Sequence, residues 1–142
     1  MFCLINDDKE YVSKYGEISY GYVEIKKSKF HSYIFNVKGI SIEEIKSKIE
    51  DIKKDNKKAR HVLYAYEVII DGVKQVKFSN DNEPQGTGVN SVISTLEKEG
   101  VTNYLVVMVR YYGGVLLGAG PLLRTYLKTF KDAYNECKKE LI

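Results

Sequence analysis

One histidine and two carboxylates are the side chains of this sequence best suited to acid–base chemistry or metal binding. His61 begins the stretch HVLYAY, and Asp81 and Glu83 lie in the stretch SNDNEPQGTG. Imidazole and carboxylate groups are the usual components of such sites, but no HExxH or similar spacing is present. We therefore expect no catalytic residue, no metal and no cofactor. Asp81 and Glu83 are predicted to cap their loop or to pair with Arg110, and His61 to make a local hydrogen bond.

Two loops have the composition of an anion-binding site. The stretches Ser79–Gly88 and Arg110–Tyr126 hold both prolines and most of the eleven glycines, and each leads into a predicted helix. The first amides of a helix have no intrahelical partner, glycine lets a ligand approach them, and arginine can bind an oxyanion through two hydrogen bonds. The predicted ligand is phosphate or sulfate. The candidate residues are His61, Asp81, Glu83, Gly86, Thr87, Arg110, Tyr111, Gly113, Gly114, Gly118, Gly120, Arg124 and Tyr126.

A purely structural role for these residues is the alternative. The glycines of the second loop would then serve turns and close helix–sheet packing, and Pro121 would sit in a first helical turn, where its missing N–H costs nothing. Neither loop matches a Walker or dinucleotide fingerprint. Tyr111, Tyr112 and Tyr126 could stack on nucleic-acid bases or pack in the core with a wet hydroxyl end. The spacing leaves both interpretations open.

Two hairpins are predicted from alternating residues and turn signals. Residues 18–25 and 30–37 alternate tyrosine and β-branched residues with polar ones, with KKSK between them. Residues 61–70 and 73–78 flank Asp71-Gly72, a strong hairpin signal.

Three helices and one further strand complete the predicted order. Helical spacing of apolar residues appears over 42–59, from Val89 to a cap at Gly100, and from Pro121 onward. Residues 104–109 are apolar on both faces, as expected of a central strand covered on both sides. The order ββαββαβα predicts an α+β fold, a two-layer sandwich in which helices pack on a mostly antiparallel sheet.

This topology brings the chemically interesting residues to one edge of the sheet. The second hairpin places His61 at the same end as Ser79, and a parallel crossover from there to residue 109 would deliver Arg110 to that end as well. We call this edge, where His61 and the loops 80–88 and 110–120 are expected to meet, the rim.

Length and charge limit the classes of function. The 142 residues fit one domain over 18–142, while residues 1–17 are the least patterned and are expected to form either a loose arm or an added sheet edge. No apolar run approaches the roughly 18 residues of a membrane span, and no leader pattern is seen, so we expect a cytoplasmic protein without membrane contact. The net charge is only +3, so any contact with a polyanion must come from a local patch.

Three ordered motifs resemble the signature of the Impact N-terminal domain family, which includes bacterial YigZ-type proteins and the eukaryotic protein IMPACT. They are ARHVLYAY, SNDNEPQGTG and VRYYGGVLLGAGPLLRTY, and they follow KKSKF. The resemblance spans about Lys26 to Tyr134, and the family's motif positions include all the candidate residues above. It implies a fold similar to the second domain of ribosomal protein S-five.

The sequence also departs from the family pattern. Asn80 replaces an aspartate, Asn82 a glycine, Leu116 a common lysine and Pro121 a glycine, while Gly88-Val89 stands where Ala-Gly is usual. Losing a carboxylate and a lysine argues against retained ion or phosphate binding at the rim. Relatives of YigZ usually continue into a smaller ferredoxin-like domain, which this sequence lacks, so we expect either a truncated chain or a single-domain member.

Three hypotheses about function follow from the residues and the resemblance. The first is a non-enzymatic, translation-associated or stress-regulatory module that binds RNA, the ribosome or a translation factor through the rim, with Arg110, Arg124 and nearby tyrosines in contact. The second is a protein-interaction regulator, as the resemblance to eukaryotic IMPACT implies, in which the rim or the lysine-rich helix over 42–59 contacts an acidic protein surface. The third is an enzyme for a phosphorylated small molecule, with His61, Asp81 and Glu83 handling protons.

Overall fold

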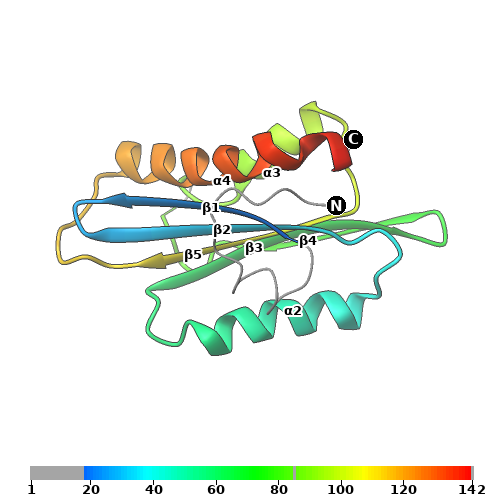
Figure 1. The fold of residues 1–142 in the computed structure, drawn as a ribbon, viewed down its shortest axis with the longest axis horizontal. Coiled ribbons are helices and arrows are strands. Elements are labelled where there is room, and N and C mark those ends of the chain that lie inside the picture. The colour runs from blue at the N-terminus through cyan, green and yellow to red at the C-terminus, as the bar shows by residue number, and fades with distance from the viewer. Residues whose placement is uncertain (1–17, 85, 142) are drawn as a thin grey trace.

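The structure, a computed structural model, describes residues 18–84 and 86–141, so the arm or edge expected at 1–17 lies outside the described residues. Its eight elements follow the predicted order ββαββαβα, which is confirmed (Figure 1). They are β1 (Ile18–Ile25), β2 (Ser28–Asn36), α2 (Ile42–Asp55), β3 (His61–Ile70), β4 (Val73–Ser79), α3 (Asn90–Lys98), β5 (Tyr104–Tyr111) and α4 (Ala119–Leu141).

The five strands form one sheet in the order β1-β2-β5-β3-β4, and every neighbouring pair is antiparallel. Both β4 and β5 run antiparallel to β3, so they are parallel to each other, and the connection through α3 passes over β3. The predicted parallel relation of residues 73–78 to residues 104–109 is therefore confirmed. As a result, the chain emerges at the same end of the sheet after β4 and after β5.

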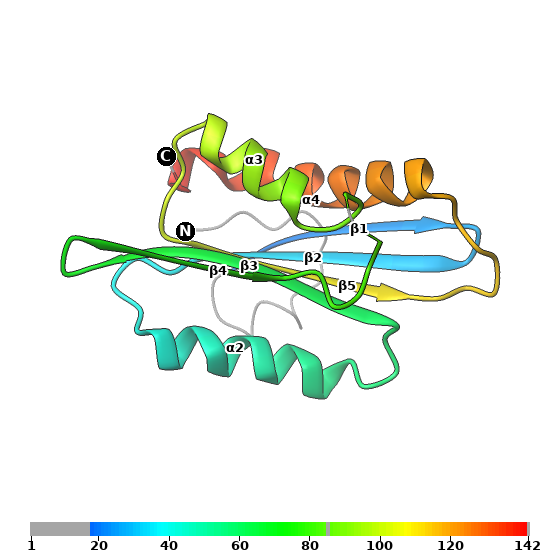
Figure 2. The ribbon, with the colours of Figure 1, turned by 180° about the vertical axis from the view of Figure 1, so that it is seen from behind.

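Helices cover both faces of the sheet. Figures 1 and 2 show α3 and α4 on one face and α2 on the other. The molecule thus has three layers, one more than the two-layer arrangement expected from the sequence. The reason lies in β5, whose residues from Tyr104 to Arg110 are all buried, so that both of its faces need a cover. The expectation that this strand is covered on both sides is confirmed.

Two apolar clusters hold the layers together. On one face, α2 buries Ile45, Ile49 and Ile52 against the sheet. On the other, α4 buries Tyr126 and Phe130, with further residues of α3, β2 and β5 in the same cluster. Periodicity placed these residues correctly because each helix has a single apolar stripe facing the sheet.

Side-chain hydrogen bonds determine where α2 begins and ends. Ser41 caps α2, its hydroxyl accepting from the Glu44 amide at 3.2 Å. The helix ends at Asp55, before the predicted limit of residue 59, because Asn56 leaves the helical conformation and its side chain donates to the Ile52 carbonyl.

Among the described residues, no helix has the length and apolar content needed to cross a membrane.

Candidate functional site

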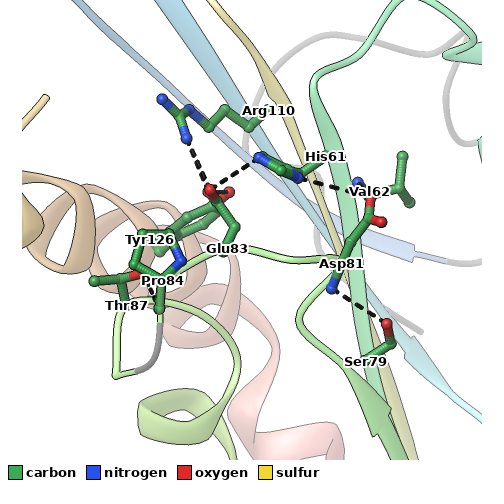
Figure 3. Close-up of polar contacts among 9 residues, drawn as sticks. All are labelled: His61, Val62, Ser79, Asp81, Glu83, Pro84, Thr87, Arg110 and Tyr126. Atoms are coloured by element: carbon green, nitrogen blue, oxygen red, sulfur yellow. Dashed lines mark hydrogen bonds and ion pairs between the residues drawn. The ribbon is translucent and has the colours of Figure 1, made fainter. Parts of the chain in front are cut away.

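Residues from four separate segments meet at the end of the sheet where the rim was predicted. In the ladder between β3 and β5, His61 lies directly opposite Arg110. The loop after β4 then carries Asp81 and Glu83 to the same place, and Tyr126 reaches it from the second turn of α4 (Figure 3). The convergence of His61 with the loop after β4 and with the end of β5 is thus observed.

The carboxylate of Glu83 lies at the centre of this group, and its side chain is only 1% exposed. Arg110 Nη1 lies 2.9 and 3.0 Å from the two carboxylate oxygens, and the Tyr126 hydroxyl donates to one of them. His61 Nε2 lies 3.1 Å from Glu83 Oε1. Arg110 itself is buried, its guanidinium lying 5.9 Å from the Phe30 ring centroid. We call Glu83, Arg110, Tyr126 and His61 the Glu83 cluster.

The Glu83 cluster is arranged to hold segments together. Burial, followed by the nearby Glu83 charge and hydrogen bond, raises the pKa of Tyr126 far above its ordinary value, so the phenol stays neutral and donates. Asp81 accepts from the Val62 amide at 2.8 Å. The predicted pairing with Arg110 is confirmed for Glu83, whereas Asp81 bonds instead to the start of β3. His61 contacts Glu83 and Asp81, at 3.1 and 3.9 Å, across the sheet edge. Within the described residues, no group of three metal-ligating side chains could hold a metal ion.

Hydrogen bonds within the loop after β4 connect its described residues, 80–84 and 86–88. The Thr87 hydroxyl donates to the Pro84 carbonyl at 2.5 Å, and the Glu83 amide donates to the Asn80 carbonyl at 3.0 Å. Gly86 has a φ of +82°, which favours glycine.

Asn80 holds the start of α3, although from sequence it stood out only as a departure from the family pattern. Its Oδ1 accepts from the Val89 amide at 2.7 Å, and its Nδ2 lies 3.0 Å from Asn90 Oδ1, so it caps the start of α3 from nine residues away. Gly88 makes room for it, since an added Cβ would lie 2.0 Å from Asn80 Oδ1. Sequence patterns for helix caps involve residues next to the start of the helix, so they do not reveal a capping residue nine positions earlier.

The second glycine loop takes a different course from the Glu83 cluster. Tyr111 faces the α2 side of the sheet, where its hydroxyl bonds to the Asn56 side chain. Gly113 packs against the β1–β2 turn, its amide donating to Ser28 Oγ at 3.1 Å, and the neighbouring Gly114 has a φ of +96°.

The start of α4 holds the remaining candidates. The Gly118 carbonyl accepts from the Leu122 amide, so the helix begins at Ala119, two residues before Pro121. Gly120 lies beside the exposed side chain of Arg124.

The structure gathers six of the thirteen candidates at the end of the sheet. They are His61, Asp81, Glu83, Thr87, Arg110 and Tyr126. The other seven lie around them or on the opposite face.

An exposed basic surface lies at the same end of the molecule. The Arg60 guanidinium lies 4.5 Å from the centroid of the half-exposed Tyr112 ring, and the Arg60 amide donates to the Arg110 carbonyl. The Gly113 contact with the β1–β2 turn brings Lys26 and Lys27 to the same loop. We call residues 26–27, 56–60 and 112–118 the basic end, because together they hold five basic and no acidic residues: Lys26, Lys27, Lys57, Lys58 and Arg60.

Two aliphatic side chains project from the basic end. Leu116 is 79% exposed and Val115 is 46% exposed. From sequence, Leu116 stood out only as a replaced lysine, Arg60 was expected at the rim beside His61, and Val115 was not singled out. The pairing of Arg60 with Tyr112 gives no sequence signal, because it depends on the ladder that sets β3 beside β5.

Comparisons with known proteins identify the same family as the three sequence motifs. The sequence profile described as the Impact N-terminal domain matches residues 26–134. The chain is 38% identical over 104 residues to "IMPACT family member YigZ" of Escherichia coli (strain K12), covering 72% of this chain and 50% of that protein. It spans about half the length of the curated bacterial relatives it matches, at 50%, 57% and 51%.

Two solved structures have the same fold. A crystal structure described as that of a hypothetical protein superposes with a TM-score of 0.73 and 32% identity, covering 85% of this chain and 58% of that chain. The structure of the "two-domain translational regulator Yih1" gives a TM-score of 0.55 at 22% identity, covering 84% and 46%, and shares the fold alone. The match of the family profile to most of the chain, together with the identity to YigZ, shows that this chain belongs to the Impact N-terminal domain family.

Proposed function

We propose that this chain is a non-enzymatic, translation-associated module that binds ribosomal RNA through the basic end. One observation carries the proposal: three segments far apart in sequence, which between them hold five basic and no acidic residues, meet at one end of the sheet. Asp81 is the exposed carboxylate nearby, and it is bonded to the Val62 amide. Phosphate contacts supply most of the affinity for RNA, and Arg60 over Tyr112 adds a planar surface on which an unpaired base can stack. The link to translation rests on family membership and on the translational regulator that shares the fold.

The geometry of the Glu83 cluster favours binding over catalysis. A general acid or base must reach a substrate, but Glu83 is almost fully buried and already accepts from Arg110 and Tyr126. Arg110 is buried and paired with Glu83, so an RNA phosphate would be met by exposed cations of the basic end such as Arg60. The Glu83 cluster then serves as the rigid support of the basic end, because Arg110 is bonded through its carbonyl to the Arg60 amide.

The exposed aliphatic residues favour one second candidate, a regulator that binds a protein. Leu116 and Val115 can neither bond a phosphate nor stack on a base, whereas a protein partner can bury them in an apolar socket while acidic side chains meet the lysines around them. Nuclease treatment separates the two candidates, because only RNA-dependent association is lost when RNA is digested.

Co-sedimentation with purified ribosomes tests the proposal. The variant Lys57→Glu/Lys58→Glu/Arg60→Glu reverses three charges of the basic end, and we expect it to remain in the supernatant while the wild type pellets. Each lost phosphate contact should also reduce the slope of log affinity against log salt by about 1, measured from about 50 to about 200 mM salt.

A matched control carries the same charge change elsewhere. Lys98→Glu/Lys128→Glu/Lys131→Glu alters exposed lysines of α3 and α4, outside the basic end, and should pellet as the wild type does. Equal loss of binding in both triple variants would show general charge attraction and contradict the proposal. Retained binding in a folded basic-end variant would also contradict it.

A further inference from the structure

A hollow of about 260 Å³ lies on the α2 face of the sheet, on the face opposite the Glu83 cluster. It forms where α2 leaves the edge strand β4 uncovered. Its lining comes from three elements: Lys46, Ile49, Glu50 and Lys53 of α2, Tyr64 and Tyr66 of β3, and Lys77 of β4. The register explains the last of these, because Lys77 lies directly opposite Tyr66 in the ladder.

The walls of this hollow are positively charged. Three lysines face one carboxylate, that of Glu50, which lies 3.7 Å from Lys53 Nζ. Among the side chains described in residues 18–84 and 86–137, no carboxylate lies within ion-pairing distance of Lys46 or Lys77. The net lining charge of +2 matches the charge of a phosphate monoester, and both partners of the Glu50–Lys53 pair are well exposed, so Lys53 can turn toward a ligand at little cost.

The floor of the hollow is aromatic. The rings of Tyr64 and Tyr66 are nearly parallel, at an interplanar angle of 12° and a centroid distance of 6.4 Å. Tyr64 is half-buried and Tyr66 is buried, so the backbone of β3 holds both rings in place. Lys53 Nζ lies 5.7 Å from the Tyr64 centroid, so the cationic wall and the aromatic floor adjoin each other.

We propose that this hollow binds one nucleotide unit, with its phosphate held by Lys46, Lys53 and Lys77 and its base against Tyr64. Cationic groups beside an aromatic surface are the combination that proteins use for single-stranded nucleic acid, where the base stacks and the phosphate is neutralised. The volume lies just below the range of about 300–1,000 Å³ typical of ligand pockets, so the hollow holds a single nucleotide and no more. The nucleotide can be free or part of an RNA strand. The site is separate from the basic end and does not rest on the proposed function.

Isothermal titration calorimetry on the full chain tests this site. The probes are AMP, ADP, ribose 5-phosphate, inorganic phosphate and a short oligouridylate. We expect AMP to bind at least about tenfold more tightly than ribose 5-phosphate, because both carry one phosphate and only AMP offers a base to stack. Lys77→Glu should weaken ADP binding by at least about tenfold, since it reverses a charge that contacts the phosphate.

The control is Lys54→Glu, which makes the same charge change on the same helix at a residue outside the lining, and it should bind ADP as the wild type does. If the mononucleotides are silent but the oligouridylate binds and Lys77→Glu weakens it, the site is one for a nucleotide within a strand, which supports the proposal. The proposal would be overturned if neither ADP nor the oligouridylate bound, or if inorganic phosphate bound as tightly as ADP. Tighter binding of an oligoglutamate peptide than of either nucleotide probe would also contradict it. So would equal ADP binding by Lys77→Glu and Lys54→Glu. Loss of ribosome binding in the basic-end variant with ADP binding intact would show that the two sites are independent.

Discussion

At the scale of single residues, Glu83 determines how the end of the sheet is held together. One buried carboxylate joins β3, β5, α4 and the loop after β4 through His61, Arg110 and Tyr126. A buried ion pair of this kind gives little net stability compared with an apolar pair, but removing one partner leaves a buried charge uncompensated. The carboxylate therefore fixes a specific arrangement of segments more than it stabilises the fold.

Replacing Glu83 tests this role. We expect Glu83→Ala to lower the free energy of unfolding by about 3–5 kcal/mol, because Arg110 would stay buried without its partner. The double variant Glu83→Leu/Arg110→Met removes both charges and should be more stable than the single variant. Urea denaturation followed by circular dichroism gives both values. A cost below about 1 kcal/mol for Glu83→Ala would mean that the pair is not sealed from water.

His31 makes the stability depend on pH. Burial, and then the charge of Lys29, lowers its pKa from 6.5 to about 4, and its Nδ1 lies 2.5 Å from the Tyr20 hydroxyl. The folded-state pKa lies below that of the unfolded chain, so the unfolded chain binds more protons between these values. The stability that neutral His31 confers is therefore complete above about pH 6.5 and is lost as the pH falls toward about 4, by at most roughly 3 kcal/mol.

Unfolding in urea across this pH range, for the wild type and for His31→Gln, measures the effect. The variant should lose most of the dependence between about pH 4 and about pH 6.5. The ring protons of His31, followed by NMR in the folded protein, give an independent reading. A titration midpoint near 6.5 would show that the ring is solvated and would contradict the account.

At the scale of elements, the loop between β5 and α4 is shaped by its contact with the β1–β2 turn. An added Cβ at Gly113 would lie 2.2 Å from the Lys27 carbonyl carbon and 2.4 Å from the Ser28 nitrogen, both backbone atoms that cannot move aside independently. Gly118, five residues later, has only the Pro121 ring at 3.6 Å. The two glycines thus have different reasons to be glycine, which their shared motif does not reveal.

Alanine substitutions at these two positions should separate the roles. We expect Gly113→Ala to destabilise the protein by about 1–3 kcal/mol, since the loop must shift away from the turn. Gly118→Ala should cost less, about 0.5 kcal/mol, because a Cβ fits there and only the preference of a helix N-cap for glycine over alanine is lost. Thermal unfolding of the two variants side by side checks this, and similar costs would show that the contact with the turn does not constrain the loop.

The elements show how far the sequence could be interpreted. Over residues 18–84 and 86–141, periodicity predicted the strands and helices in order, because each helix has one apolar stripe and the strands carry β-branched and tyrosine residues. The parallel relation of β4 and β5, and with it the meeting of His61, Glu83 and Arg110, followed from the hairpin and the crossover. The separation of Tyr111 from this group could also have been found, because successive residues of a strand face opposite sides. The path of the second glycine loop toward the β1–β2 turn could not, since it depends on a tertiary contact.

At the scale of the whole molecule, two separate cationic surfaces accompany a sheet covered on both faces. The basic end collects the connections β1–β2, α2–β3 and β5–α4 at one end of the sheet (Figure 1). The hollow lies along the side, where α2 does not extend over β4. The net charge of only +3 reveals neither surface, because acidic residues elsewhere on the molecule offset the basic residues gathered at these two places.

Site-specific photo-cross-linking tests the central claim most directly. A photoreactive amino acid replaces Leu116 in the basic end or, as the control, the exposed Lys128 on α4, and each protein is irradiated with purified ribosomes. The account predicts adducts with ribosomal RNA from position 116 and none from position 128. Adducts from position 128 alone, or from neither position while the protein still pellets with ribosomes, would show that the basic end is not the binding surface.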